Sequence, residues 1–267
     1  MKILNGKELA EFIQERQAKD VRRLVQANGV QPKLAIVVTV DHPAIEVYMR
    51  MKQRYGNEIG IAVDVHRVKQ TELQTTIEAL NADASVSGII VQLPLEDPSQ
   101  TDSVVDLVAP EKDVDALGAN AIYQPATPMA ILWLLAGYNV ELRGKNIVLV
   151  GRGKLVGAPL ERILTETGHS VTVVDRKTTD IAEAFKAAEV IITATGQPGL
   201  ITSVMIPANA VVVDAGVASE QGKTVGDLAE DVRERIDLTI TPEKGGVGPL
   251  TICALFDNVL RATRATV

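Results

Sequence analysis

The N-terminal stretch of the chain carries apolar residues at helical spacing. This spacing places them on one face and predicts an amphipathic helix over residues 7–27. Asn28-Gly29 follows, and glycine or asparagine ends helices because both tolerate the left-handed backbone. The next segment, KLAIVVTV (33–40), is a short β-branched apolar run, which predicts a buried parallel strand. The residues on the helix face are Leu9, Ile13, Val21, Leu24 and Val25.

Strands and helices are then expected to alternate along the whole chain. Such alternation is typical of open parallel sheets that helices cover on both faces. In the first half we expect strands at 33–40, 61–68 and 88–95, and helices at 43–55 and after Thr71. In the second half we expect strands at 146–151, 170–175, 190–196, 210–216 and 238–241, and a last helix at 249–266.

A loop-like stretch from Asp113 to Pro128 separates the two halves, and the apolar segment PMAILWLLAGY follows it. A chain of 267 residues is long for one compact domain and comfortable for two. We therefore predict an α/β protein of two open parallel-sheet domains, 1–124 and 125–248, with a cleft between them.

Composition narrows the possible partners. The formal net charge of −7 disfavours nucleic acid, because phosphate binding needs clustered Lys and Arg. The scarcity of aromatic residues argues against platforms on which bases stack. The three histidines are scattered without metal-ligand spacing, so we expect no metal site.

The number of cysteines and the hydropathy of the chain indicate the cellular compartment of the protein. Cys253 is the single cysteine, which excludes an intramolecular disulfide and fits a reducing compartment; we expect it buried in the last helix rather than reactive. The first residues, MKILNGKELAEF, lack the long apolar run of a signal peptide, and no run is long enough to span a bilayer. We therefore expect a cytoplasmic protein without membrane contact.

A glycine-rich turn follows the strand NIVLV. The sequence GRGKLVG (151–157) leads from that strand into a helix, as in sites that bind a pyrophosphate at a helix N-terminus. Its G-x-G-x-x-x-G spacing is one residue longer than the usual fingerprint. The next strand ends in Asp175, about where a ribose-binding acid is expected. We predict dinucleotide binding and a Rossmann-like second domain; a turn that needs glycines only for its geometry is the alternative.

The choice between NAD and NADP stays open at this point. Asp175 could accept hydrogen bonds from the ribose of NAD and repel a 2′-phosphate. Arg152, Arg176 and Lys177 could instead pair with that phosphate.

A candidate acid–base group lies in the first half. Tyr48 and Lys52 stand four residues apart, so on a helix they share one face. Desolvation in a cleft would make the lysine a usable acid or base near neutral pH, although such a pair is more often a surface contact. Gln92 lies near the end of a buried strand, where ligands of parallel sheets bind. Asp113 and Asp115 lie in a loop that could reach the same crevice; the alternative is that these acids only solvate the loop and cap a helix.

Taken together, these segments resemble the bifunctional methylenetetrahydrofolate dehydrogenase/methenyltetrahydrofolate cyclohydrolase family. The resemblance runs in order along nearly the whole chain, and the combination of QLPL, KDVD and GGVGP is highly specific. The matching pieces are NGKELA, the helix with Tyr48 and Lys52, GIIVQLPL, PEKDVDA, PATP, GRGKLVGAPL, ATGQPGLI, VVVDAGV, VGDL and TPEKGGVGPLT.

The resemblance implies two reactions. Members oxidise 5,10-methylenetetrahydrofolate by hydride transfer to NADP, in some members NAD, and hydrolyse the methenyl product to 10-formyltetrahydrofolate. It also implies that the last helix, about 249–267, returns to the N-terminal domain and that the protein is a homodimer. We favour NADP because Arg152 matches the phosphate contact of the family.

The resemblance further implies roles for individual residues. Lys52 carries the proton transfers of hydrolysis, Gln92 tunes it, Tyr48 orients the substrate and Asp115 holds the pterin ring. The other substrate-binding residues implied are Leu93, Gly248, Pro249 and Thr251, and Gly246 and Val247 belong to the same closing loop. The implied cofactor-binding residues are Gly151, Arg152, Gly153, Lys154, Gly157, Asp175, Arg176, Thr195, Gly196 and Val217.

The chain departs from the family pattern at several positions. Ile45 stands where the family usually has serine, which affects polar substrate contacts, and Ala116 stands where it usually has glycine. Asp175-Arg176 replaces the usual His-Ser and bears on the cofactor. The remaining departures are Gly153 for serine and Glu243-Lys244 for Val-Pro.

Three alternatives to a bifunctional enzyme remain. Ile45 and Asp175 motivate a member with only one of the two activities. A non-catalytic protein that binds folate or dinucleotide would also keep the fold, although Tyr48, Lys52, Gln92 and Asp115 argue against it. A different Rossmann dehydrogenase with a Lys–Asp pair, such as a shikimate-type enzyme, is the third.

Overall fold

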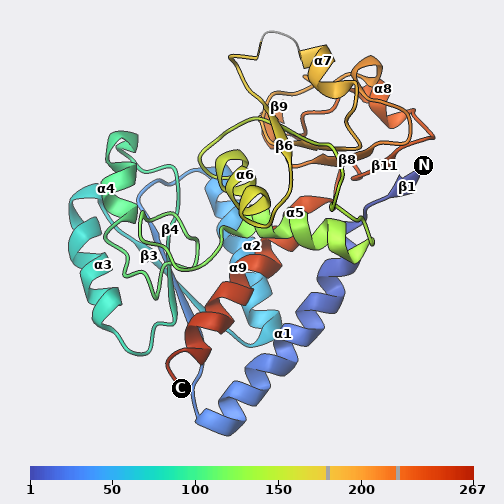
Figure 1. Ribbon diagram of the computed structural model, residues 1–267. Helices are drawn as coiled ribbons and strands as arrows, with labels where there is room; N and C mark the ends of the chain where they lie inside the picture. Colours follow the sequence, from blue (N-terminus) through green and yellow to red (C-terminus); the bar gives the residue numbers. More distant parts are fainter. Residues whose placement is uncertain (179–180, 221–222) are drawn as a thin grey trace. The chain divides into compact units, whose positions relative to one another are not determined.

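A computed structural model describes residues 1–178, 181–220 and 223–267 of the chain (Figure 1). The chain forms two compact units. Unit 1 comprises Met1–Ala10 and Thr127–Thr251, and unit 2 comprises Glu11–Ala126 and Ile252–Val267. Each unit contains a parallel sheet, which confirms the predicted α/β class with two parallel-sheet domains. The cleft predicted between the halves stays a prediction.

The sheet of unit 2 has the strand order β3-β2-β4, and all its pairs are parallel. The central strand β2 (Lys33–Val38) is apolar and almost fully buried, as its continuous β-branched run predicts. Its neighbours are β3 (Ala62–Arg67) and β4 (Gly88–Val91). Since all three strands run in the same direction, the loops that follow them emerge at one edge of the sheet.

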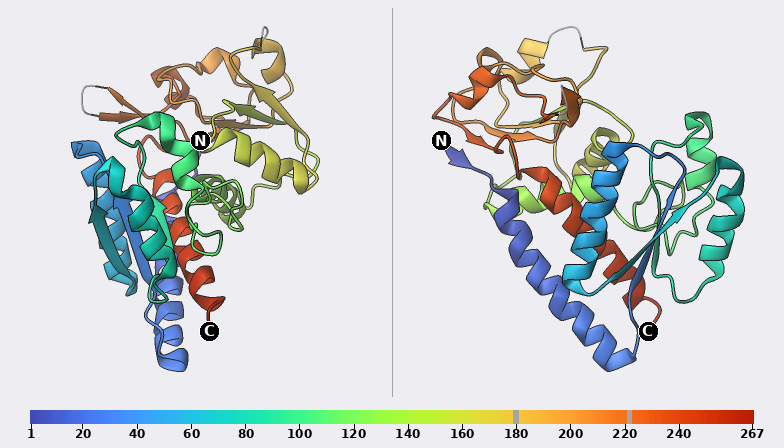
Figure 2. Two further views of the ribbon diagram at one scale, coloured as in Figure 1. Left: turned by 90° about the vertical axis from the view of Figure 1, so that its left-hand side faces the viewer. Right: turned by 180° about the vertical axis from the view of Figure 1, so that it is seen from behind.

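Helices cover both faces of this sheet (Figures 1 and 2). On one face α3 (Leu73–Ala82) packs its apolar residues against β2 and β4. On the other face lie α1 (Gly6–Asn28), α2 (Pro43–Ile59) and α9 (Val247–Arg264). The short helix α4 (Thr101–Val105) follows β4 in sequence and adds two buried valines.

Helices α1 and α9 are far apart in sequence but lie side by side in unit 2. The Gln17 side chain donates to the Cys253 carbonyl oxygen at 2.8 Å, and the Tyr55 hydroxyl donates to Gln17 Oε1 at 2.7 Å. Arg16 and Asp257 form an ion pair at 3.2 Å at the edge of this contact. Cys253 is buried, as predicted, and its burial raises the pKa of the thiol to about 11.

Unit 1 contains a six-stranded sheet with the order β1-β11-β8-β7-β5-β6 and only parallel pairs. Its strands are β5 (Ile147–Val150), β6 (Val171–Val174), β7 (Val190–Thr193), β8 (Val211–Asp214), β11 (Thr239–Ile240) and β1 (Lys2–Ile3). Strands β9 (Ala218–Glu220) and β10 (Lys223–Val225) form a separate antiparallel pair. The helices are α5 (Ala126–Gly137), α6 (Gly157–Glu166), α7 (Ile181–Phe185) and α8 (Glu230–Arg233).

Some predicted boundaries are wrong. The strand expected at 88–95 ends at Val91, because the chain turns into the Gln92–Leu95 segment, where Pro94 has no N–H to donate. The last helix begins at Val247 rather than at Pro249, so the proline lies inside the first turn, where helical N–H groups have no partner within the helix. Strand β1 was not expected, since two residues carry no periodic pattern.

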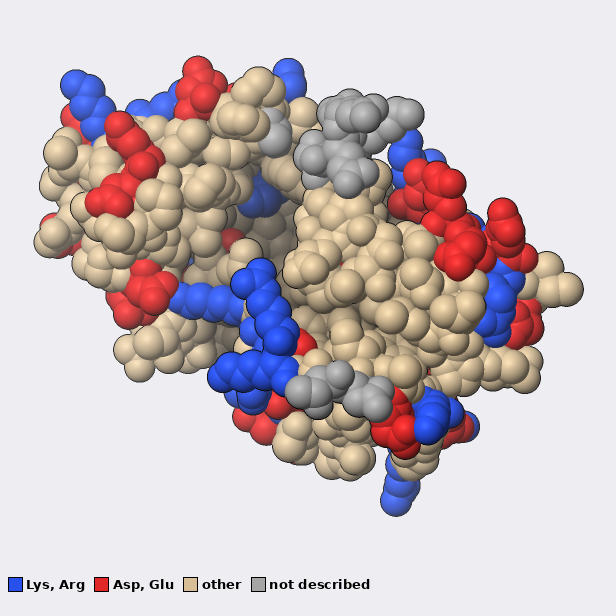
Figure 3. All heavy atoms as spheres, turned by 90° about the horizontal axis from the view of Figure 1, so that it is seen from above, with Lys and Arg blue, Asp and Glu red and all other residues tan. Residues whose placement is uncertain are grey.

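The described surface carries mixed charge. On the face that Figure 3 shows, Lys and Arg side chains stand beside Asp and Glu over much of the surface, and several of them gather in one group. Exposed ion pairs such as Arg54–Glu58 and Arg162–Glu166 have this character. In the part of the chain that the structure describes, no helix is long and apolar enough to cross a membrane.

Candidate active site

Lys52 and Gln92 meet at the carboxyl edge of the unit 2 sheet. Lys52 lies on α2, and its Nζ donates to Gln92 Oε1 at 2.9 Å. Gln92 follows β4, and its backbone N–H donates to Val37 O at 2.8 Å. The Gln92 Nε2 donates to the Leu93 carbonyl oxygen at 3.0 Å, which directs the other end of the amide, Oε1, towards the lysine.

The position of this pair agrees with the topology of the sheet. The chain leaves β2 towards β3 and then crosses back to β4, so the strand order reverses between β2 and β4. In open parallel sheets, ligands bind outside the carboxyl ends of the strands at such a point. Gln92 follows the end of β4, as predicted, and therefore stands where open parallel sheets bind their ligands.

The loop with Asp115 is held against β4 by its backbone. Ile89 N–H donates to Lys112 O at 2.8 Å, and residues 89 and 113 form a parallel bridge. Gly88 has no side chain, and a Cβ there would lie 2.6 Å from Val114 Cγ1, so the glycine permits this close approach. The loop therefore runs beside β4 and carries Asp115 into the electrostatic reach of Lys52.

The two acids of the KDVD motif have different surroundings. Asp113 is buried and accepts hydrogen bonds from the backbone N–H groups of Gly118 at 2.9 Å and Leu117 at 3.4 Å. It thus closes the turn that follows. Asp115 is partly buried and interacts electrostatically with Lys52. Asp113 is a structural residue, and Asp115 faces the candidate site.

Burial sets the protonation of the site. Desolvation lowers the pKa of the Lys52 ammonium, and the negative charge of Asp115 opposes part of that decrease. Desolvation likewise raises the pKa of the Asp115 carboxyl, and Lys52 opposes it. Perturbed lysine and carboxyl groups that lie together in this way are typical of functional sites.

Tyr48 lies one helical turn before Lys52 on α2, and its side chain is 46% exposed. It can therefore reach a ligand without a change in the fold. Ile45, which precedes it by three residues, is 6% exposed and belongs to the core. The apolar residue at the position where serine is usual is thus buried and offers a ligand no polar group.

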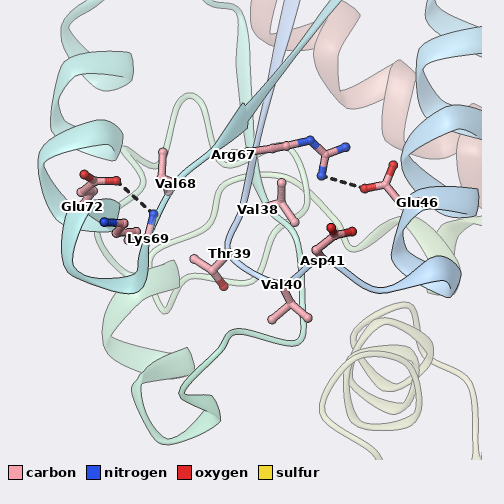
Figure 4. A pocket seen from close by; sticks show the side chains of 9 residues that line it. All are labelled: Val38, Thr39, Val40, Asp41, Glu46, Arg67, Val68, Lys69 and Glu72. Atoms are coloured by element: carbon pink, nitrogen blue, oxygen red, sulfur yellow. Dashed lines mark hydrogen bonds and ion pairs between the residues drawn. The ribbon is translucent and has the colours of Figure 1, made fainter.

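A hollow lies at the carboxyl ends of β2 and β3 (Figure 4). Its volume is about 570 Å³, and the Arg67–Glu46 ion pair, 2.7 Å long, crosses one side of it. None of the predicted site residues lines this hollow; its lining consists of Val38, Thr39, Val40, Asp41, Glu46, Arg67, Val68, Lys69 and Glu72.

Glycines determine the shape of the turn between β5 and α6 in unit 1. Gly151 has a φ of 98°, a conformation that side chains disfavour. A Cβ on Gly157 would lie 2.1 Å from Gly151 O, so the first turn of α6 packs directly on the loop. A Cβ on Gly153 would meet nothing within 4 Å, which leaves that side open to a ligand. The loop can therefore hold a pyrophosphate at the N-terminus of α6.

The loops after β7 and β8 border the same edge of this sheet. A Cβ on Gly151 would lie 2.7 Å from Ala194 O, so the β5 and β7 loops touch. Thr195 N–H donates to Asp227 Oδ2 at 2.8 Å, while Gly196 has a φ of 65°. Val217, after β8, is 59% exposed. The strand order reverses between β5 and β7, and open parallel sheets bind ligands outside the carboxyl ends of the strands at such a point.

Two buried aspartates fix these loops. Asp227 is fully buried and also accepts from Gln197 N–H at 2.9 Å. Asp214, at the end of β8, accepts from the N–H groups of Asp227 at 3.0 Å and Gly216 at 3.0 Å, and pairs with Arg233 at 3.4 Å. Burial raises the pKa of the Asp214 carboxyl, although the backbone donors oppose this shift.

The charged candidates of unit 1 lie on loops after β5 and β6. Asp175 Oδ1 accepts from Lys177 N–H at 2.8 Å, which forms a tight turn, and Arg176 is exposed. Lys154 is exposed in the glycine-rich loop. The guanidinium of Arg152 is bound by Glu161, a residue that the sequence did not single out.

The predicted closing loop leads into α9. Gly246 lies against the start of α1, because a Cβ on Gly6 would lie 1.8 Å from Gly246 O. Val247, Gly248 and Pro249 form the first turn of α9. The Thr251 hydroxyl donates to Val247 O at 3.3 Å, one turn earlier.

Comparisons with known proteins give the family of the chain. Residues 4–115 match the model of the tetrahydrofolate dehydrogenase/cyclohydrolase catalytic domain, and residues 125–267 match that of the tetrahydrofolate dehydrogenase/cyclohydrolase NAD(P)-binding domain. The chain belongs to the tetrahydrofolate dehydrogenase/cyclohydrolase family. The bifunctional protein FolD of Exiguobacterium sibiricum is 37% identical over 98% of this chain and 99% of that protein. The resemblance inferred from the sequence is confirmed.

Solved structures of the same family share the fold. The bifunctional FolD of Campylobacter jejuni superposes with a TM-score of 0.93 at 33% identity and covers 100% of both chains. The Trypanosoma brucei methylenetetrahydrofolate dehydrogenase-cyclohydrolase, solved with NADP and an inhibitor, has a TM-score of 0.91 at 29% identity, over 98% of this chain and 97% of that one.

Besides Glu161, the residues Asn258 and Asp227 hold loops of the candidate sites, although the sequence assigns neither of them a role. The buried Asn258 of α9 donates through Nδ2 to Val114 O and Gln124 O, each at 2.9 Å, and thereby holds the loop before Asp115. Asp227 holds the loop with Thr195. Asn258 lies in no motif, and Asp227 lies in the VGDL segment without an assigned role, because each acts through backbone atoms that are distant along the chain. Within 1–178, 181–220 and 223–267, no group of His, Cys, Asp and Glu could hold a metal ion.

Proposed function

We propose that this protein oxidises 5,10-methylenetetrahydrofolate to 5,10-methenyltetrahydrofolate with NADP and hydrolyses that product to 10-formyltetrahydrofolate. The observation that carries the proposal is the group formed by Lys52, Gln92 and Asp115, in which burial lowers the pKa of the lysine. This group lies in the part of the chain that matches the catalytic domain of the family. The proposal places substrate chemistry in 1–124 with the C-terminal helix, and the dinucleotide in 125–248.

The residues of unit 1 fit a nicotinamide dinucleotide. Gly151, Gly153 and Gly157 shape an open loop at the N-terminus of α6, where backbone N–H groups favour a pyrophosphate. Thr195 and Gly196 border it from the neighbouring strand. The bound dinucleotide supplies a hydride acceptor. The chain itself contributes position and exclusion of water, since the folate nitrogen lone pairs stabilise the cation that forms.

Hydrolysis needs a base and then an acid. The neutral Lys52 amine, made accessible by its lowered pKa, takes a proton from the water that attacks the methenyl carbon. The resulting Lys52 ammonium returns a proton to the folate N5 as the bond from that nitrogen to the carbon breaks. The formyl group stays on N10, and the remaining hydroxyl proton leaves to solvent, which balances the reaction.

The neighbouring residues orient the reactants. Gln92 Oε1 accepts from Lys52 in both of its protonation states, so it keeps the nitrogen in place through the cycle. The Asp115 carboxyl suits the donor-rich edge of a pterin ring. The exposed Tyr48 and the backbone of Leu93 border the same group. Gly248, Pro249 and Thr251 would complete the substrate contacts.

The test is a set of parallel assays of the purified protein. Reduction of NADP and of NAD is followed with methylenetetrahydrofolate as the substrate, and the decay of methenyltetrahydrofolate is followed separately. We expect cofactor reduction and an enzyme-dependent decay. Failure of methylenetetrahydrofolate to reduce either dinucleotide, together with unaccelerated methenyl decay, would reject the proposal.

A member with a single activity is the second candidate, and the buried Ile45 favours it. Because this side chain offers the substrate no polar contact, one of the two steps could be lost. The same assays separate the candidates: rates at comparable levels support the bifunctional enzyme, and the absence of one rate supports the single-activity member.

We also propose that the protein is a cytoplasmic homodimer that acts on small molecules and binds neither nucleic acid nor membrane. The family membership and the single buried thiol support this placement. Sedimentation equilibrium across protein concentrations would measure the assembly; a mass of one chain throughout would contradict the dimer.

A further inference from the structure

We propose that Glu161 is a specificity-determining residue that engages Arg152 and thereby weakens the selection of NADP over NAD. The inference rests on the proposed function, because it concerns the dinucleotide that serves that reaction. It concerns a contact within unit 1 alone.

The ion pair between these residues is bidentate. Arg152 Nε donates to Glu161 Oε2 at 2.7 Å, and its NH2 nitrogen donates to Glu161 Oε1 at 3.0 Å. Two parallel hydrogen bonds of this kind fix the plane of the guanidinium as well as its position. The Glu161 side chain is 24% exposed and is anchored on α6, whereas Arg152 is 57% exposed on the loop. The helix therefore determines where the arginine points.

The backbone of Arg152 lies at the strand ends where a Rossmann domain binds the adenosine ribose. Strands β5 and β6 are paired, with Val150 opposite Val174, and Gly151 N–H donates to Val174 O at 2.8 Å. The next residues, Arg152 and Asp175, thus leave adjacent strand ends. In such domains an acid at the end of the second strand binds the ribose 2′-hydroxyl, and a nearby arginine accommodates the 2′-phosphate of NADP.

Glu161 changes what the arginine can offer to that phosphate. Its carboxylate occupies two of the five donor directions of the guanidinium and neutralises the charge. A 2′-phosphate that bound the remaining donors would lie near a second anion, and like charges at such distances repel. NAD has no 2′-phosphate and does not incur this cost. Asp175 adds negative charge at the neighbouring strand end, so both acids disfavour NADP relative to NAD.

The pairing has an internal control on the same helix. Glu166 also lies on α6 and pairs with Arg162 at 3.2 Å, away from the glycine-rich loop in sequence. Replacing either glutamate by glutamine removes one negative charge from α6. Only the replacement at position 161 frees Arg152.

The experiment measures equilibrium binding of NADP and NAD to the full chain by calorimetry, for the wild type, Glu161→Gln, Glu166→Gln, Arg152→Gln and the double variant Arg152→Gln/Glu161→Gln. We expect Glu161→Gln to tighten NADP binding on the order of tenfold and to change NAD binding less than about twofold. Glu166→Gln should leave the ratio of the two affinities unchanged. In the Arg152→Gln background only the direct repulsion from the Glu161 carboxylate remains, so the effect of Glu161→Gln should become clearly smaller.

The inference is overturned if Glu161→Gln changes the affinities for both dinucleotides equally or changes neither. It is also overturned if Glu166→Gln has the same effect, or if the effect persists undiminished without Arg152. A thermal unfolding curve for each variant establishes that it is folded. If the folded wild type binds neither dinucleotide, the proposed function fails, and this result is distinct from binding of both without a response to Glu161.

Discussion

Lys52 Nζ lies 2.9 Å from Gln92 Oε1, and the acceptor is an amide rather than a carboxylate. This choice matters for a base, because a neutral acceptor holds the amine without stabilising its charged form. Desolvation can then lower the pKa of Lys52, with only Asp115 opposing it. The pair therefore positions the nitrogen and favours the neutral amine over the ammonium.

The first prediction exchanges that amide for an acid. In Gln92→Glu a carboxylate beside Lys52 favours the ammonium, so the pKa of the lysine rises. Because hydrolysis needs the neutral amine, the rising limb of its pH–rate profile should move to higher pH and the rate at neutral pH should fall. Stopped-flow measurement of methenyl hydrolysis against pH checks this. Gln26→Glu, on the exposed face of α1, should leave the profile in place; a limb that moves to lower pH in Gln92→Glu would contradict the account.

The second prediction concerns the backbone beside Asp115. Ala116 has a φ of 57°, in the left-handed region that glycine adopts without strain. Ala116→Gly should therefore stabilise the protein by about 0.5–1 kcal/mol, after the added flexibility of the unfolded chain is counted. Urea unfolding measures the change. Ala119→Gly, nearby and without positive φ, should give no gain; a loss of stability in Ala116→Gly would show that no strain is present there.

The third prediction tests the anchor of the Asp115 loop. Asn258→Ala removes the donor to Val114 O and Gln124 O and leaves both buried carbonyl groups without it. We expect a loss of about 2–4 kcal/mol in the free energy of unfolding and a higher KM for the folate substrate, since Asp115 loses its support. Chemical unfolding and steady-state kinetics measure the two effects. Asn57→Ala, at an exposed position of α2, should change neither stability nor KM. If Asn258→Ala is destabilised but keeps the wild-type KM, the loop does not contribute to substrate binding.

The fourth prediction concerns the dinucleotide loops. Asp227 accepts from the N–H groups of Thr195 and Gln197, and asparagine cannot do so with both oxygens, because its amide nitrogen is itself a donor. Asp227→Asn should weaken binding of NAD and NADP alike, on the order of tenfold, by loosening the Thr195 loop. Calorimetry measures both affinities. Asp231→Asn is the matched control, because Asp231 is exposed and binds Ser203. Unchanged affinities in Asp227→Asn would show that Asp227 does not support dinucleotide binding.

Much of this molecule is predictable because local patterns and tertiary structure agree. The periodicity of α1 and the apolar run of β2 are decided by neighbours in sequence, and both elements form close to their predicted places. The resemblance likewise led to Lys52, Gln92 and Asp115, which the structure brings together. These residues belong to segments whose types and spacing are specific.

The rest depends on partners that sequence spacing does not reveal. Asp113 and Asp115 are the same residue type and lie two positions apart. Only the fold shows that Asp113 binds the backbone of the following turn, whereas Asp115 interacts with Lys52. The resemblance implies that Arg152 contacts the phosphate, and the helix that follows supplies Glu161 as its partner within the protein. Asn258 reaches the Asp115 loop across 144 positions, a distance at which no local pattern operates.

The central claim is that Lys52 carries the proton transfers of hydrolysis but not hydride transfer. The most direct test is Lys52→Met, which removes the amine at similar length, with both steps measured separately in the folded variant. The account predicts that methenyl hydrolysis falls at least on the order of a hundredfold while cofactor reduction by methylenetetrahydrofolate remains measurable. Hydrolysis at the wild-type rate in Lys52→Met would contradict it.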